Sequence, residues 1–373
     1  MKRKIGQKVV QKSNIATGLL VIICVSFLIG GIFLFQKIQE TDFNSIEVDG
    51  TTRSYLIRLP SGYTDDDPLA LVIALHGWGG DAKEFDQGSG FTQLAEKENF
   101  IVVYPSGIAN FPFSSAAWNS GHCCAYALES GINDVSFIEL LLDHLEKEYS
   151  IDPRKIYVTG FSNGGMLSYL LGAELSDRIA AIGPVAATIG GKASSNADLW
   201  TIPDPSAALS VVAIHGKKDS KVPYEGGIGT IAGTREDLPV NESISFWITH
   251  NNCSTVPAIE MSGDEEVIKE TYSGGINNTE VVLYSIVRGG HDWPGSSRDT
   301  IRALSAAEVI WDFFKTHPKQ NFKAKNPVVT LKNTLSSLKR SKLAINTNYS
   351  LFIDFFNPDL FTDLAHFRKC WNE

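Results

Sequence analysis

The sequence predicts an α/β fold with a mostly parallel sheet and helices on both faces. Short apolar runs rich in β-branched residues alternate along the chain with segments of helical periodicity. This alternation is typical of parallel strands joined by helical crossovers. Several of the apolar runs are followed directly by loops that contain glycine and polar side chains. Open α/β sheets place their sites at the carboxyl ends of strands, so these loops are the first place to look for chemistry.

The N-terminal half of the domain supplies three expected strands and one expected helix. Residues 53–59 alternate apolar and polar side chains, as an early strand does. Residues 69–75 and 100–104 are continuous apolar runs typical of buried strands. Apolar residues at helical spacing predict a helix over 135–149, and Asp134 is expected to cap it rather than to act as a catalytic acid.

The C-terminal half continues the same alternation. The expected strands share β-branched or small apolar residues and lie at 157–161, 179–187, 211–216 and 281–287. The expected helices are a stretch that includes residues 166–171 and a final helix over 301–314, which would pack beside the loop at residue 291.

Ser162 is the candidate nucleophile. It lies between a strand and a helix in the segment Gly160-Phe161-Ser162-Asn163-Gly164. A tight strand-to-helix turn holds a serine hydroxyl clear of its surroundings, and it needs residues without Cβ two places before and after the serine because the backbones there crowd together. The Gly-x-Ser-x-Gly pattern alone is weak, but its position between strand and helix strengthens it.

The acid and the base of a catalytic triad are expected downstream. Asp219 follows the strand at 211–216, and His291 follows the strand at 281–287. Serine, then aspartate, then histidine is the chain order of α/β-hydrolases. The alternatives for the acid are Asp198 and Asp204. The alternatives for the base, His76 and His215, stand beside glycine at strand ends and are expected to be structural.

Backbone N–H groups are expected to form an oxyanion hole. One comes from Asn163, at the start of the helix after the serine. The other is assigned to Trp78, with Gly77 as the alternative, in the glycine-rich loop after the strand at 69–75. Trp118 and Trp293 are candidates for lining a substrate cleft, with plain packing as the alternative.

These motifs together resemble the feruloyl esterase and polyhydroxybutyrate depolymerase family of secreted serine esterases. The resemblance covers roughly residues 45–317 and rests on several segments in the family's order, which are 75–80, 118–119 with 123–124, 133–137, 160–166, 215–224 and 290–295. It implies the α/β-hydrolase fold and the catalytic roles of Ser162, Asp219 and His291. Members of this family cleave esters of feruloylated or acetylated plant polysaccharide, or of hydroxyalkanoate polyesters.

The N-terminus reads as a signal anchor. Residues 1–14 hold five basic side chains and no acidic one, and residues 15–35 are uncharged and largely apolar, long enough to span a bilayer core. A cleaved signal is the alternative, although no small-residue cleavage site follows. A linker over 36–44 would then lead to a catalytic domain over 45–318, placed outside the membrane or in the lumen.

Charge separates the catalytic domain from a C-terminal extension. Residues 15–318 contain 19 basic and 38 acidic residues, a net charge of −19, which argues against nucleic acid as a partner. Residues 319–373 contain nine basic and four acidic residues and a run of aromatic side chains. They are expected to be a linker with a short, packed or partly disordered extension; a membrane- or partner-binding tail is the alternative.

Cysteines and histidines suggest disulfides rather than metal sites. An exoplasmic domain meets oxidising conditions, so Cys253 is expected to pair with Cys123 or Cys124, because a trans peptide between adjacent cysteines fits a disulfide poorly. No cysteine or histidine cluster has metal-ligand spacing, and the expected hydrolysis needs no cofactor.

The sequence therefore predicts a serine ester hydrolase, most simply a feruloyl esterase acting on plant polysaccharide. A polyhydroxybutyrate depolymerase and an acetylxylan esterase are alternatives within the same chemistry. A serine peptidase of the prolyl-oligopeptidase type and a non-catalytic surface binding module are alternatives from other classes.

Overall fold

The computed structural model describes residues 43–110, 115–231, 233–262, 264–299 and 301–320 of the 373-residue chain. All of them belong to one compact unit, Met1–Phe322. The predicted basic arm, the membrane anchor at 15–35 and the extension beyond 320 lie outside the described residues. Within the described ranges, no helix is both long enough and apolar enough to cross a membrane.

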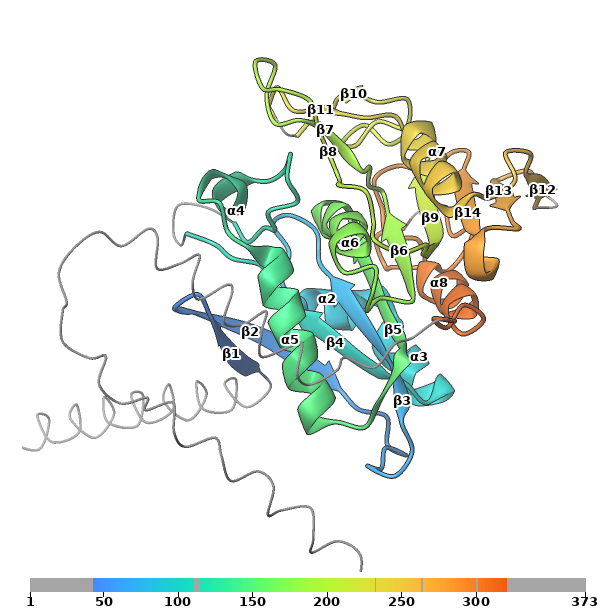
Figure 1. Cartoon of the computed structure of the whole chain (residues 1–373). Coiled ribbons are helices and arrows are strands. Elements are labelled where there is room, and N and C mark those ends of the chain that lie inside the picture. Colours follow the sequence, from blue (N-terminus) through green and yellow to red (C-terminus); the bar gives the residue numbers. More distant parts are fainter. Residues whose placement is uncertain (1–42, 111–114, 232, 263, 300, 321–373) are drawn as a thin grey trace, which may run out of the picture. The chain divides into compact units, whose positions relative to one another are not determined.

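The described residues are organised around a ten-stranded sheet (Figure 1). In spatial order its strands are β1 (Asn44–Val48), β2 (Thr51–Arg58), β4 (Ile101–Pro105), β3 (Leu69–Leu75), β5 (Ile151–Phe161), β6 (Ala181–Val185), β9 (Ser210–Gly216), β14 (Val281–Ile286), β13 (Val267–Tyr272) and β12 (Ala258–Met261). The six strands from β4 to β14 are parallel, and the two strands at each end run antiparallel to their neighbours. The mostly parallel sheet predicted from the sequence is thus confirmed for its centre.

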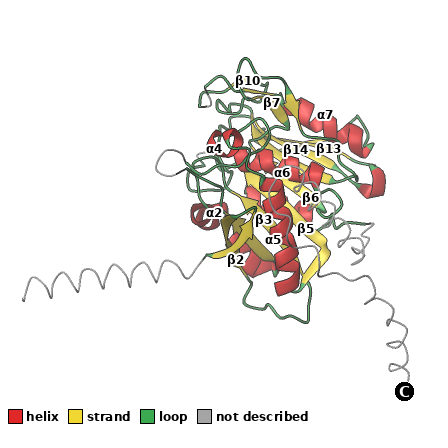
Figure 2. Ribbon diagram, turned by 60° about the vertical axis from the view of Figure 1, so that its left-hand side comes forward, coloured by secondary structure: helices red, strands yellow, loops and turns green. Residues whose placement is uncertain are grey.

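Helices cover both faces of this sheet (Figure 2). Strand β3 shows why, since all seven of its residues are buried and successive side chains enter opposite cores. One core is closed by α5 (Asp134–Glu148), α6 (Asn163–Glu174) and α7 (Val240–Asn251). The other is closed by α2 (Ala82–Ser89), α3 (Phe91–Glu98) and α8 (Ala306–Phe314).

A second, four-stranded sheet was not predicted. It is antiparallel, and its strands are β10 (Gly227–Ile228), β11 (Glu236–Asp237), β7 (Gly190–Lys192) and β8 (Trp200–Thr201). These strands have two or three residues each, too few for a periodicity to show. The short helix α4 (Ala125–Glu129) and the 3₁₀ turn η1 (Ile276–Asn278) complete the described elements.

The predicted strands and helices are confirmed, with shifted ends. Strand β5 begins at Ile151, earlier than expected, and helix α6 extends on both sides of the predicted 166–171. Helix α8 begins at Ala306 rather than 301, because Ser305 caps it by accepting a hydrogen bond from the backbone N–H of Glu308.

The predicted cap of α5 was wrong by one residue. Asn133 is the cap, and its side chain accepts the N–H of Ser136. Asp134 turns instead toward β2, where its carboxylate pairs with Arg53 at 2.7 Å and accepts the backbone N–H of Asn119 at 2.7 Å. Both partners of the pair are buried. Asp134 therefore connects strand β2 to helix α5 and to the loop at residue 119.

The predicted disulfide was also wrong. Cys123 and Cys124 are bonded to each other, across a cis peptide bond in place of the trans bond that the prediction assumed. Cys253 is a free, buried thiol just beyond α7, with its Sγ against the carbonyl oxygen of Thr279. The paired sulfurs instead accept hydrogen bonds from the guanidinium of Arg235, at 3.1 and 3.5 Å.

Candidate active site

Ser162 occupies a sharp turn between β5 and α6. Its backbone has φ 55° and ψ −121°, a region that residues with a Cβ rarely adopt. The turn is held from both sides, because the N–H of Ser162 donates to Val185 O at 2.8 Å and its carbonyl oxygen accepts the N–H of Met166 at 2.9 Å. The strain therefore persists where the hydroxyl is presented, as expected for a nucleophile elbow.

Two glycines make this turn possible, as the sequence predicted. A Cβ on Gly160 would lie 2.3 Å from Gly164 O, and a Cβ on Gly164 would lie 2.4 Å from the carbonyl oxygens of Leu75 and His76. No real side chain tolerates such separations from backbone atoms. Strand β5, helix α6 and the end of β3 can meet at this point only without side chains.

The structure brings together the three residues expected to form a triad. His291 Nε2 lies 2.9 Å from Ser162 Oγ, and His291 Nδ1 lies 2.7 Å from Asp219 Oδ2. The three residues follow strands β5, β9 and β14 at the same edge of the sheet. The arrangement is that of a nucleophile, a base and an orienting acid.

The carboxylate of Asp219 is fully engaged. Its Oδ1 accepts the backbone N–H groups of Lys221 and Val222 at 2.8 and 2.9 Å. Burial by itself raises the pKa of Asp219, but hydrogen bonds from His215 and His291 outweigh it and hold the pKa well below its usual range. Asp219 is therefore ionised at neutral pH and can stabilise a protonated His291.

The alternative residues fall elsewhere. Asp198 and Asp204 are exposed, whereas Asp219 is bonded to His291. His76 is buried, and burial lowers its pKa. Its Nε2 accepts the N–H of Gly107 at 2.9 Å, and its Nδ1 lies 2.8 Å from Gly77 O, the structural role expected for it. His215 is buried as well, but it contacts Asp219, which the sequence did not indicate.

Asn163 contributes in two ways. Its backbone N–H is the first of helix α6, and such N–H groups have no partner within the helix and carry the positive end of the helix dipole. Its buried side chain accepts the N–H of Trp118 at 2.8 Å and donates to Trp118 O at 3.0 Å. A Cβ on Gly77 would lie 3.4 Å from Ser162 Cβ, so the loop that carries Gly77 and Trp78 runs beside the serine. Which of the two supplies the second N–H stays a prediction.

Trp118 and Trp293 do not line a cleft in this structure. Trp118 is fully buried and donates its indole N–H to His76 O at 2.8 Å. Trp293 is 5% exposed, donates its indole N–H to Ser89 O at 2.9 Å and packs against Phe85. Both tryptophans are therefore packing residues, which was the alternative. The expectation that they line a substrate cleft was wrong for each.

Two other aromatic residues neighbour the candidate triad. Trp78 is 39% exposed on the loop beside Ser162. The half-buried ring of Phe161 lies 5.0 Å from the imidazole of His291, measured between centroids. Phe161 stands next to the serine in the elbow motif, and this adjacency is the only sequence signal that could have identified it.

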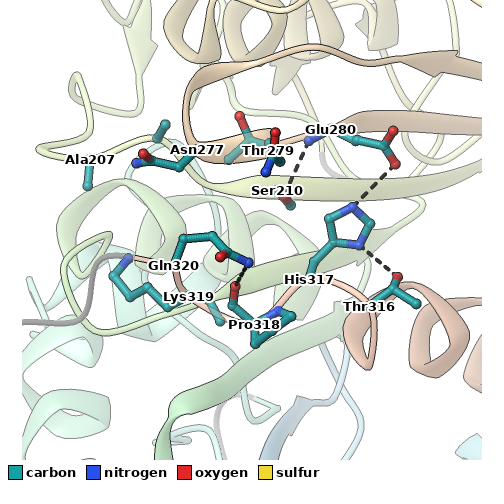
Figure 3. A pocket seen from close by; sticks show the side chains of 13 residues that line it. Ala207, Ser210, Asn277, Thr279, Glu280, Thr316, His317, Pro318, Lys319 and Gln320 are labelled. Atoms are coloured by element: carbon teal, nitrogen blue, oxygen red, sulfur yellow. Dashed lines mark hydrogen bonds and ion pairs between the residues drawn. The ribbon is translucent and has the colours of Figure 1, made fainter.

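One described cavity lies away from the triad. It has a volume of about 430 Å³ and is lined by residues at the starts of β9 and β14, including Ser210 and Glu280, and by the segment after α8. Figure 3 shows the ion pair of His317 with Glu280 at 3.2 Å and the hydrogen bond of Glu280 N to Ser210 Oγ at 3.2 Å. The amino ends of parallel strands lie opposite their carboxyl ends, so this cavity is not part of the candidate active site.

Fold and site together define an α/β-hydrolase with a serine nucleophile. Comparison with known proteins is consistent with this class. Residues 53–224 match the profile of the family described as Esterase PHB depolymerase. The chain is similar to α/β-hydrolase serine esterases, a group that includes feruloyl esterases and polyhydroxybutyrate depolymerases, and the enzyme class that these matches indicate is carboxylic ester hydrolase.

Over the aligned residues, the relatives that match are about a quarter identical to the chain. Feruloyl esterase B of Piromyces equi is 28% identical over 271 residues, 70% of this chain and 45% of that protein. The putative esterase NocK of Nocardia uniformis is 28% identical over 301 residues, 73% of this chain and 82% of that protein. Feruloyl esterase C of Emericella nidulans is 26% identical, covering 74% and 88%. The chain thus spans less than half of the first relative and most of the other two.

Solved structures agree on the fold. The acetyl xylan esterase from Aspergillus awamori superposes with a TM-score of 0.50 at 16% identity, covering 73% of this chain and 98% of that chain. The native crystal structure named sOPH has a TM-score of 0.51 at 15% identity, covering 76% and 91%.

Proposed function

We propose that the protein hydrolyses carboxylic esters by a double displacement in which Ser162 is the nucleophile. The observation that carries this proposal is the continuous path from Asp219 Oδ2 through the imidazole of His291 to Ser162 Oγ, with separations of 2.7 and 2.9 Å. Both lie within the range over which a proton moves between a base and its partner.

In the first step, His291 Nε2 takes the proton of the Ser162 hydroxyl while Oγ attacks the ester carbonyl. Asp219 stabilises the imidazolium that forms. The tetrahedral intermediate collapses, the alcohol leaves with the proton from His291, and the acyl group stays on Oγ. Water then attacks the acyl carbonyl and gives its proton to His291. The second tetrahedral intermediate collapses, His291 returns that proton to Ser162 Oγ, and the acid is released.

The negative charge on the tetrahedral oxygen needs donors. Asn163 N–H and Trp78 N–H, or Gly77 N–H in its place, are the proposed oxyanion hole. The support for Asn163 is its place at the N-terminus of α6, directly after the nucleophile. The close approach of Gly77 to Ser162 supports the loop from which the second donor comes.

We propose esters carried by plant polysaccharide as the substrate, with feruloyl esters first. The support comes from the names of relatives, which include feruloyl esterases and a bifunctional acetylxylan esterase/xylanase from Neocallimastix patriciarum. The exposed indole of Trp78 and the ring of Phe161 would offer an aromatic acyl group a surface. Acetyl esters of xylan and hydroxybutyrate oligomers are the alternatives.

The esterase domain is proposed to lie outside the cell or in a lumen, tethered by residues 15–35. The support is the sequence alone, an uninterrupted apolar run behind five basic residues. Protease treatment of intact cells should digest the catalytic domain and spare the N-terminus. An N-terminal sequence starting near Lys37 would instead establish secretion after cleavage.

A fluorophosphonate probe tests the activity, since only an activated serine reacts. The full-length chain is expected to be labelled and to hydrolyse p-nitrophenyl acyl esters, and Ser162→Ala is expected to lose both by several orders of magnitude. His291→Ala should be nearly as severe, and Asp219→Asn milder. Unlabelled wild-type protein would indicate a binding module, and undiminished turnover by Ser162→Ala would remove this serine from the mechanism.

The substrate is decided by comparing kcat/KM on one preparation. Methyl ferulate, p-nitrophenyl acetate and a hydroxybutyrate trimer separate the three ester classes, and a peptide nitroanilide tests the peptidase alternative. Ferulate is expected to be preferred. A trimer preferred by tenfold or more would indicate a polyester depolymerase, and activity confined to acetate would indicate a deacetylase.

A further inference from the structure

The carboxylate of Asp219 faces a second histidine. His215 is the penultimate residue of β9, and its side chain is 2% exposed. Its Nε2 lies 2.9 Å from Val222 O and 3.3 Å from Asp219 Oδ2, the oxygen that also meets His291. The ring of Tyr224 packs edge-on against the imidazole, with centroids 5.7 Å apart.

These contacts fix which nitrogen carries the proton. A carbonyl oxygen and a carboxylate oxygen can only accept, so Nε2 of His215 must be the donor. One N–H therefore serves the main chain of Val222 and the side chain of Asp219 together. Val222 in turn donates its own N–H to Asp219 Oδ1 at 2.9 Å, which closes a small network around the carboxylate.

We propose that His215 is a positioning residue of the catalytic acid, clamping the turn 219–222 through Val222 O and fixing Asp219 Oδ2 so that it accepts from His291. This inference rests on the proposed function. It assigns His215 no contact with substrate. Its role is to hold the acid whose orientation sets the tautomer and direction of the base.

The position of His215 in the strand supports this role over plain packing. In the sheet, His215 lies opposite Ser285 of β14, the strand that leads to His291. The acid, its clamp and the base are thus attached to one pair of parallel strands. An apolar ring at 215 would fill the same space beside Tyr224, but it would leave Val222 O without this donor and Asp219 Oδ2 with one donor fewer.

The clamp also has an electrostatic consequence. The charged or titratable side chains acting on the Asp219 carboxylate are His215, from β9, and His291, from the loop after β14. A further charge, Lys217 Nζ, lies 5.5 Å from the centroid of the Tyr224 ring, which in turn packs against His215. An N–H that donates to Oδ2 draws charge away from His291. Removing it should therefore leave more of the Asp219 charge to stabilise a protonated imidazole and move the acid limb of kcat/KM to higher pH.

Three variants of the full-length chain test the proposal. His215→Phe keeps a ring and removes the donor, and His215→Gln keeps an N–H donor at similar reach. Tyr224→Phe is the matched control, because it removes only the hydroxyl that meets Ser285 Oγ at 2.7 Å. With a p-nitrophenyl ester, His215→Phe is expected to lose about 10- to 100-fold in kcat at little-changed KM. Its acid limb should move to higher pH than that of the wild type. His215→Gln should recover most of the rate, and Tyr224→Phe should match the wild type.

The result that overturns the proposal is equally specific. If His215→Phe keeps the wild-type kcat and pH profile, or if His215→Gln falls as far as His215→Phe, the histidine is packing only. NMR titration of labelled histidines, with His291→Gln to assign the signal, reads the pKa of His291 without any turnover. If the wild type neither hydrolyses esters nor reacts with fluorophosphonate, the proposed function fails, and this titration still decides between a shifted and an unshifted His291.

Discussion

Replacing Ser162 by glycine is expected to stabilise the fold while abolishing hydrolysis. The backbone at Ser162 has φ 55° and ψ −121°, where a Cβ is strained and glycine is not. Such strain costs about 1–3 kcal/mol. Glycine also lowers the free energy of unfolding by about 0.5–1 kcal/mol, because the unfolded chain with glycine has more conformational freedom to lose. The net gain in free energy of unfolding over a variant that keeps the Cβ therefore lies between about 0 and 2.5 kcal/mol, or about 1 kcal/mol at the middle of these ranges.

Ser162→Ala is the matched control for this effect. Both variants lose the hydroxyl and its contact with His291 Nε2, and only glycine also loses the Cβ. Thermal unfolding of the two full-length variants should place the Tm of Ser162→Gly a few degrees above that of Ser162→Ala, since 1 kcal/mol corresponds to about 2–4 °C in a domain of this size. A lower Tm for the glycine variant would refute the reasoning that the elbow stores backbone strain.

Three further outcomes are expected. Gly164→Ala should fold poorly, because its Cβ would lie 2.4 Å from two carbonyl oxygens. Gly88→Ala on helix α2 has nothing within 4 Å of its Cβ, so it should be neutral or stabilising. The Tm of each variant checks these expectations. Asp219 has a lowered pKa in the folded state, so its contribution to stability is present above its unfolded pKa of about 4 and is lost as pH falls. Urea unfolding at a series of pH values should show that the free energy of unfolding falls less steeply with decreasing pH for Asp219→Asn than for the wild type. Equal pH dependence of the two proteins would contradict this. In mass spectra without reduction, the peptide with Cys123 and Cys124 should be lighter by two hydrogens and resist alkylation, and two alkylated thiols would exclude the bond.

The sequence was sufficient for the features that depend on neighbouring residues. Continuous apolar runs such as 69–75 became central strands, and Gly160 and Gly164 were needed for the reason given, a close approach of backbones. The triad could be located because each member lies at the end of a strand or in the loop that follows one. Parallel strands end at one edge of the sheet, so chain order alone brought Ser162, Asp219 and His291 to the same edge.

Features set by distant contacts could not be predicted in the same way. Trp118 is buried with its indole N–H bonded to His76 O, 42 residues away in the chain. Trp293 is buried with its indole N–H bonded to Ser89 O, 204 residues away. Nothing in the local pattern of either tryptophan distinguishes a packed ring from an exposed one. Asp134 is adjacent to the helix cap, but a charge on β2, Arg53, draws its side chain away from the helix end. The pairing of the cysteines likewise depends on where α7 places Cys253.

The order of the strands explains why glycines recur around His291. The serine follows β5 and the histidine follows β14, with β6 and β9 between them, so the loop after β14 must cross the ends of two strands to reach Ser162. It crosses β9 in close contact, since a Cβ on Gly216 would lie 2.4 Å from the carbonyl oxygens of Gly289 and Gly290. Strand spacing is about 4.8 Å, and a loop lifted by one side chain would no longer hold the imidazole 2.9 Å from Oγ. Gly216 therefore matters for the site in the same way as the glycines of the elbow, because its missing Cβ sets how closely the loop that carries His291 passes over β9.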